Sequence, residues 1–157
     1  MTREEENIAG TIIIGLGNPI VSDDSVGVCA ARRLDKVKEV REVADVHEVY
    51  AGGLRLLDVL VGYKRAIIID AMQTGIQPGT VRRFDISDLP KTRNLASSHD
   101  SDLPTALEAG RKLGMELPGE IVVFGIEAED VVNFGEKLTP AVARGLEEVL
   151  GKIKNLL

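Results

Sequence analysis

Apolar runs and segments of helical periodicity alternate along this chain. Aliphatic runs within 11–16, 65–70 and 121–126 predict strands that are buried on both faces of a sheet. Two more polar segments, 43–50 and 80–86, predict further strands. We place the strand at 80–86 at an edge of the sheet, because three of its residues are charged.

Helices are predicted between and after these strands. Their apolar positions recur at helical spacing, and the predicted helices cover residues 26–37, 54–61, 103–113 and 139–153. The first begins directly behind Asp23 and Asp24, which we expect to cap it. The segment 86–102 has few apolar residues and no clear period, so we predict a long loop there.

This alternation predicts the fold class. Strands separated by helices imply right-handed crossovers and a mostly parallel sheet that is covered on both faces. We therefore expect an α/β protein with three layers (α/β/α), in which a twisted sheet of about five strands lies between helices. The chain has no repeat, low-complexity tract or linker, and 157 residues suit one compact unit, so we expect a single domain over 1–157.

Composition and charge narrow the function classes. Hydrophobic residues make up 44% of the chain, which is too many for a disordered protein. The charge balance of 19 basic and 25 acidic residues (19 − 25 = −6) argues against a nucleic-acid partner. The single Cys29 excludes an internal disulfide framework and is expected to be a small buried hydrophobe.

The chain carries no recognisable targeting or membrane segment. Residues 1–9 are charged and lack the apolar stretch of a signal peptide. No apolar run approaches the ~20 residues needed to span a bilayer. We therefore expect a cytoplasmic protein without a membrane partner.

A glycine-rich turn follows the first predicted strand. It reads Gly15-Leu-Gly17-Asn18-Pro19, and Asp23 and Asp24 stand at the start of the helix that comes next. A nucleotide-binding turn leaves this helix start free for phosphate, whereas here two carboxylates fill it. The turn is therefore expected to hold a cation or a water rather than a phosphate.

Further carboxylates follow the other central strands. In a parallel sheet the site lies beyond the carboxyl ends of the strands, and Asp24, Asp70, Glu127 and Glu129 all stand there. Taken singly, Asp24 could be a helix cap and Asp70 could cap its own turn. If the first and third strands are neighbours, both carboxylates point into one crevice, where they require a proton or a cation between them.

The two histidines differ in context. His47 lies within a predicted strand and is expected to be structural or exposed, whereas His99 lies in the long loop, among Ser98, Asp100 and Ser101. A loop histidine is often simply solvated, but a long loop in a small domain is usually functional or disordered. His99 with Asp24 and Asp70 would make a ligand set for Ni, Zn, Fe or Mn that could activate water or polarise a carbonyl.

Other catalytic motifs are missing from the sequence. There is no phosphate-binding Gly-x-x-x-x-Gly-Lys-Ser/Thr and no Gly-x-Ser-x-Gly elbow. A dinucleotide fingerprint would need glycine where Ile20 stands.

Read together, these segments resemble the nickel–iron hydrogenase maturation endopeptidases, which trim the C-terminus of the hydrogenase large subunit. The similarity runs nearly end to end and rests on the order of motifs at 15–27, 67–71, 97–111, 123–127 and 138–140. Each motif is modest alone, and together in this order they are specific.

The resemblance implies a function and a set of site residues. It implies an aspartyl-type endopeptidase activity toward the nickel-loaded precursor of the large subunit, with metal contact by Asp24, Asp70 and His99. The nickel would arrive with the substrate and report that its insertion is complete, so the protease would store no metal of its own. Zinc or cadmium could replace nickel in vitro. Asp23 or Asp100 could serve as the carboxylate that handles protons.

Two departures and two rivals remain. The family commonly has glycine where Ser25 stands, and an acid followed by Gly-Gly-Thr where this chain has Tyr50-Ala-Gly-Gly-Leu54. One rival is a non-catalytic, nickel-dependent checkpoint of assembly. The other is a peptidyl-tRNA hydrolase-like esterase, whose similar glycine turn matches only as far as Pro19.

Overall fold

The computed structural model describes residues 10–50, 55–86, 92–96 and 103–157. Its centre is one five-stranded sheet in the order β2-β1-β3-β5-β4. The strands are β1 (Thr11–Gly17), β2 (Asp45–Tyr50), β3 (Arg65–Met72), β4 (Val81–Asp85) and β5 (Glu120–Glu127). Four of them run parallel, and β4 pairs antiparallel to β5 at the edge, as its charged residues predicted.

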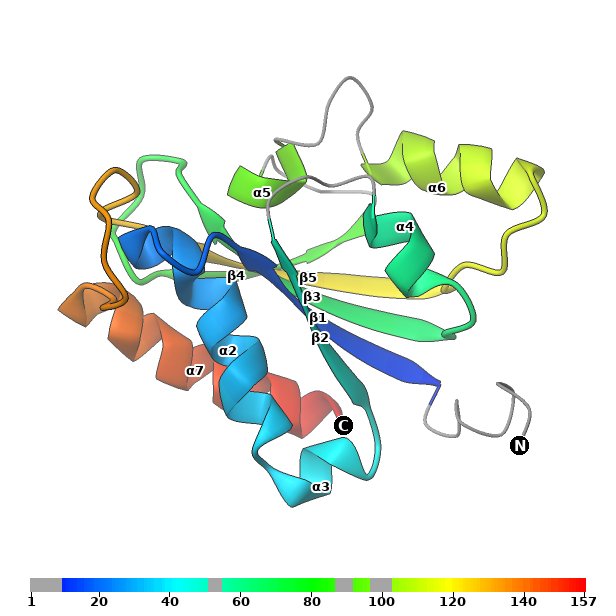
Figure 1. The fold of residues 1–157 in the computed structure, drawn as a ribbon, viewed down its shortest axis with the longest axis horizontal. Coiled ribbons are helices and arrows are strands. Elements are labelled where there is room, and N and C mark those ends of the chain that lie inside the picture. Colours follow the sequence, from blue (N-terminus) through cyan, green and yellow to red (C-terminus); the bar gives the residue numbers. More distant parts are fainter. Residues whose placement is uncertain (1–9, 51–54, 87–91, 97–102) are drawn as a thin grey trace.

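Helices cover both faces of this sheet (Figure 1). They are η1 (Ser22–Ser25, 3-10), α2 (Val26–Asp35), α3 (Lys38–Arg41), α4 (Arg55–Leu60), α5 (Arg93–Ala96), α6 (Leu103–Lys112) and α7 (Pro140–Leu156). On one face α2, α3 and α7 pack against the sheet, and on the other face α4, α5 and α6 do so. The predicted three-layer α/β/α fold is confirmed.

The central strands alternate between two apolar cores. In β3, Ile67 and Ile69 join the core under α2 and α7, whereas Ile68 joins the core under α4 and α6. All three side chains are fully buried. A strand buried on both faces needs apolar residues at every position, and this requirement made the central strands readable from sequence.

The first glycine turn is shaped by close packing of α2 on the sheet. A Cβ at Gly15 would collide with the backbone carbonyl of Gly27, and a Cβ at Gly27 would collide with the carbonyls of Leu16 and Ile69. The two glycines therefore let η1 and the start of α2 lie directly against β1 and β3. This contact places η1, which carries Asp23 and Asp24, beside the carboxyl end of β3.

Two local expectations were wrong. Residues 86–102 were expected to form an uninterrupted loop, but α5 lies inside this segment. The first helix was expected to continue to residue 37, but it ends at Asp35 and the separate helix α3 follows. Both α3 and α5 have four residues, which is too short for a helical period to be visible in the sequence.

Candidate functional site

Asp24 and Asp70 lie together at the carboxyl edge of the sheet. Strands β1 and β3 are parallel neighbours, with Gly15 beside Ile69. Asp70 stands near the end of β3, and Asp24 lies in η1, the helix that follows β1. Asp70 is 0% exposed and Asp24 is 5% exposed.

Asn94 of α5 joins the two carboxylates. Its Nδ2 group donates to Oδ1 of Asp24 at 2.9 Å and to Oδ1 of Asp70 at 2.7 Å. A single amide group therefore occupies the position between two acidic oxygens. This bridge gives both nearly buried carboxylates a hydrogen-bond donor at the point where they face each other.

Backbone groups hold Asp70 in place. Its Oδ2 accepts hydrogen bonds from the backbone N–H of Asn94 at 2.6 Å and of Leu95 at 3.1 Å, and its Oδ1 accepts one from Ala71 at 2.9 Å. Burial raises the pKa of Asp70 to about 6, although the hydrogen bonds from Asn94 act in the opposite direction. Asp70 therefore holds a proton more readily than an exposed aspartate does.

Asp24 has a charged partner as well as the amide. Nε of Arg93 lies 3.1 Å from its Oδ1. Burial raises the pKa of Asp24, while Asn94 and then Arg93 act to lower it. Arg93 also donates from Nη1 to Oε1 of Gln73 at 3.1 Å, so its guanidinium group links α5 to the chain that follows β3. Helix α5 thus supplies both the neutral and the positive partner of the carboxylate pair.

The raised pKa of Asp70 predicts a pH dependence of stability in the metal-free protein. Its pKa of about 6 in the folded state lies above the ordinary value of 3.8. The stabilisation from this group is therefore fully present below pH 3.8 and is lost as the pH rises through about 6. The free energy of unfolding of the wild type minus that of Asp70→Asn should fall by about 2 kcal/mol between pH 4 and 7.

Urea titrations at several pH values measure this difference. Asp35→Asn is the matched control, because Asp35 is exposed at the end of α2. The pH dependence of its difference from the wild type is subtracted from that of Asp70→Asn. A remaining difference that is independent of pH would show that burial does not perturb Asp70.

Asp23 has a structural position, unlike its neighbour. Its Oδ2 accepts hydrogen bonds from the backbone N–H of Glu129 (2.9 Å) and Asp130 (2.8 Å) and from Oγ1 of Thr139 (2.8 Å). Its Oδ1 accepts one from the backbone N–H of Thr139 at 2.8 Å. The expectation that Asp23 caps α2 is therefore wrong, while its role as a proton carrier stays a prediction. Its fully bonded carboxylate fastens the segment after β5 to η1.

The first turn of α2 has no side-chain cap from either aspartate. The residue before the helix is Ser25, and its hydroxyl instead donates to the carbonyl of Ser22 at 2.6 Å. Cys29 lies one turn further along, half-buried, with Sγ 3.6 Å from Oγ of Ser25. The expectation that Cys29 is fully buried was therefore wrong, although it packs against the core under α2.

The two acids at the end of β5, Glu127 and Glu129, differ in position. Glu127 is buried, and its carboxylate accepts hydrogen bonds from the backbone N–H and Oγ1 of Thr74 and from the N–H of Gly75. It therefore holds the turn after β3. Glu129 is exposed, and neither residue contacts the carboxylate pair through a hydrogen bond within the described residues.

His99 and Asp100 lie outside the described residues, so their predicted roles stay predictions. His47 lies on β2 and is exposed, as expected. Within the described ranges no group of three or more His, Cys, Asp or Glu side chains could hold a metal ion. The structure thus brings together Asp24 and Asp70, two members of the predicted triad.

Sequence reasoning missed the contribution of Arg93 and Asn94. Both belong to α5, a helix that was predicted to be part of a loop because its segment shows no apolar period. A cation and an amide next to one another in a segment near the predicted acidic edge were the available signal. That signal is weak, because the contacts cross 24 and 70 residues of sequence.

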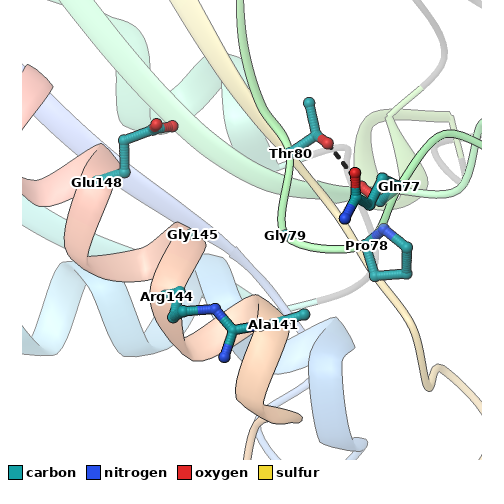
Figure 2. A pocket seen from close by; sticks show the side chains of 8 residues that line it. All are labelled: Gln77, Pro78, Gly79, Thr80, Ala141, Arg144, Gly145 and Glu148. Carbon is teal, nitrogen blue, oxygen red and sulfur yellow. Dashed lines mark hydrogen bonds between the residues drawn. The ribbon is translucent and has the colours of Figure 1, made fainter.

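A separate pocket of about 270 Å³ lies between the turn after β3 and the first half of α7 (Figure 2). It is lined by Gln77, Pro78, Gly79, Thr80, Ala141, Arg144, Gly145 and Glu148. The turn is closed by a hydrogen bond from Oγ1 of Thr80 to the carbonyl of Gln77 at 2.6 Å. None of these residues is Asp24, Asp70 or a partner of theirs, so this pocket is distinct from the candidate site.

The fold and the carboxylate pair define an α/β protein with an acidic site at the carboxyl edge of its sheet. The sequence model of the hydrogenase maturation proteases matches residues 28–156. The chain therefore belongs to the hydrogenase maturation protease family and is a peptidase. The match begins beyond Asp24, so Asp24 lies outside the matched range, whereas Asp70 and His99 lie inside it.

Individual relatives agree with this assignment. The protein MJ0253 of Methanocaldococcus jannaschii, named for the same family, is 27% identical over 91% of this chain and 96% of its own length. The hydrogenase expression/formation protein HupD of Rhizobium leguminosarum is 26% identical over 83% of this chain, which spans 65% of that longer relative. The solved structure of the [NiFe] hydrogenase maturation protease HybD from Thermococcus kodakarensis superimposes with a TM-score of 0.71 at 25% identity, covering 93% of this chain and 97% of that one.

The similarity to a peptidyl-tRNA hydrolase ends at the glycine turn. The family match covers the following strands and helices, and it places the chain among the maturation proteases instead. Within the described residues, no helix has the length and apolar character needed to cross a membrane.

Proposed function

We propose that this peptidase removes the C-terminal tail of the nickel-loaded precursor of a hydrogenase large subunit. The substrate's nickel would be recognised by Asp24, Asp70 and His99, and tail removal would follow only after the metal has been inserted. The reaction would take place in the cytoplasm, and zinc or cadmium could replace nickel in vitro.

The observation that carries this proposal is the shared position of Asp24 and Asp70. Two nearly buried carboxylates, one in β3 and one in the helix that follows its parallel neighbour β1, place hard oxygen ligands within reach of one ion. The amide of Asn94 donates to both carboxylates, and the guanidinium of Arg93 pairs with Asp24. The pair is therefore held by neutral and positive partners from α5.

The position of His99 in the sequence supports its place in the same site. It follows Asn94 by five residues. Five residues of extended chain span at most about 18 Å, so the chain length allows the proposed contact of His99 with the carboxylate pair. An imidazole is a ligand that nickel accepts readily alongside carboxylate oxygens.

Two chemical routes fit this site. The bound ion could polarise the scissile carbonyl group or lower the pKa of an attacking water. Asp70 serves as a ligand of the ion in this proposal, so a carboxylate outside the ligand set would handle protons. Asp23, which accepts four hydrogen bonds, and Asp100 are the two candidates.

A comparison of the two histidines tests the proposed triad. His99→Ala should lower the rate of precursor cleavage by about 10²-fold or more, because a ligand that positions charge at the reacting group is lost. His47→Ala is the matched control, since His47 is exposed on β2, and its rate should be that of the wild type. Cleavage is measured by mass spectrometry of the precursor over time. Equal rates for both variants would remove His99 from the site.

A non-catalytic checkpoint is the second candidate. The observation that favours it is the hold of α5 on the pair: Asn94 donates to Oδ1 of Asp24 and to both carboxylate oxygens of Asp70. The chain also lacks the usual family acid at residues 50–54. A checkpoint would bind the loaded precursor without shortening it, so the same mass measurement separates the two functions.

A further inference from the structure

The segment after β5 exposes large apolar side chains beside the candidate site. Val132 is 80% exposed and Phe134 is 81% exposed, and Ile20, in the loop after β1, is 54% exposed. The residues of this group, Ile20, Val132 and Phe134, are called the apolar rim below. Figure 1 shows the two loops meeting at the end of the sheet toward which β1, β3 and β5 run.

Hydrogen bonds join the two loops of the rim. The backbone N–H of Gly135 donates to the carbonyl of Ile20 at 2.9 Å, and the N–H of Ser22 donates to the carbonyl of Gly135 at 3.0 Å. The bonds of Asp23 to residues 129, 130 and 139 add a second attachment. The rim is therefore fastened to η1, the helix that carries Asp24.

The loop that carries Val132 and Phe134 is also ordered from within. The carboxylate of Asp130 accepts hydrogen bonds from the backbone N–H groups of Val132 and Asn133, both at 3.1 Å, and from Nδ2 of Asn133 at 2.9 Å. A loop held in this way loses little conformational freedom when a partner binds it. Such preorganisation is expected of a contact surface and is unnecessary for a solvated loop.

Asp24 and Asp70 by themselves offer too little surface to bind a protein substrate. Asp24 and Asp70 are almost entirely buried, whereas a stable protein–protein interface buries about 1,200 Å² or more. Most of the contact area must come from the surface around them. Interface cores are enriched in aromatic side chains such as phenylalanine, and a few residues near the centre contribute most of the binding energy.

We propose that the apolar rim is the docking surface for the folded body of the hydrogenase large-subunit precursor. This inference rests on the proposed function, since it supplies the contact that the cleavage reaction requires. Val132 and Phe134 are large side chains that stand four-fifths exposed on the surface. They therefore fit an apolar depression on a folded partner better than they fit an extended tail, which would need a groove on the protease.

Binding measurements test the rim independently of cleavage. The double variant Val132→Ser/Phe134→Ser is compared with the wild type for binding of the nickel-loaded precursor encoded by the same genome, measured by biolayer interferometry. We expect Kd to rise about tenfold or more, because two contact anchors are lost. In the cleavage assay KM should rise by a similar factor while kcat stays within about twofold of the wild-type value, since the rim holds no reacting group.

Leu113→Ser is the matched control. Leu113 is 83% exposed, but it lies after α6 at the opposite end of the sheet. Its Kd and KM should equal those of the wild type, and the melting temperatures of all variants should agree because each replaced side chain is exposed. Failure of the wild type to cleave would overturn the proposed function, while the Kd values would still test the rim.

Two results would overturn the docking proposal. One is an unchanged Kd for the double variant. The other is a wild-type protein that sediments as a dimer and a double variant that sediments as a monomer with unchanged precursor affinity. In that case the rim joins two copies of this chain instead of binding the substrate.

Discussion

Asp24→Asn is expected to lower the cleavage of the nickel-loaded precursor by about 10³-fold, because the ion contributes several kcal/mol to the transition state only if its ligands hold it. The substitution keeps an oxygen that can accept from Asn94 and removes the charge that attracts a cation. The effect should appear mainly in kcat, because the apolar rim still binds the precursor.

The control for this variant is Asp35→Asn, which removes one negative charge from an exposed position on α2. It should cleave at the wild-type rate and so exclude an effect of net charge. Asp70→Asn is expected to lose activity to the same degree, but its four donors also lose an acceptor, so its folding must be measured alongside. If folded Asp24→Asn cleaves the precursor at nearly the wild-type rate, Asp24 and Asp70 do not act together in the reaction.

Asp23→Ala is expected to produce the largest loss of stability. The buried carboxylate accepts four hydrogen bonds from three residues after β5, and its removal leaves those donors without their acceptor. We expect the free energy of unfolding to fall by about 3–5 kcal/mol. For a chain of this size the melting temperature should fall by about 10 °C.

Asp35→Ala is the matched control for stability, since it removes the same side chain from an exposed position. Its free energy of unfolding should stay within about 0.5 kcal/mol of the wild-type value. Thermal and urea unfolding followed by circular dichroism provide both numbers. If Asp23→Ala unfolds like the wild type, the segment after β5 does not depend on Asp23 for its attachment.

The sheet was predictable from the sequence because burial constrains every position of its central strands. Runs such as Ile67-Ile-Ile69 have no solvated face, and the alternation of these runs with helical periods gave the fold class directly. The antiparallel edge strand β4 was recognisable for the opposite reason, since its charged side chains need solvent.

The site was only partly predictable. The carboxyl ends of parallel strands share one edge, so Asp24 and Asp70 could be placed together without a structure. The partner Asn94 could not be placed, because its helix has four residues and its contacts cross long stretches of sequence. For the same reason Asp23 was misread: its partners lie more than 100 residues away, and only the folded chain brings them to η1.

The central claim is that this peptidase cleaves its substrate in response to bound nickel. The most direct measurement incubates the purified protein with nickel-loaded and with nickel-free large-subunit precursor and weighs the products by mass spectrometry. The account predicts loss of the C-terminal tail from the loaded precursor and an unchanged mass for the nickel-free one. An uncut loaded precursor would contradict the protease function, and cleavage of the nickel-free precursor would contradict the role of nickel as the signal.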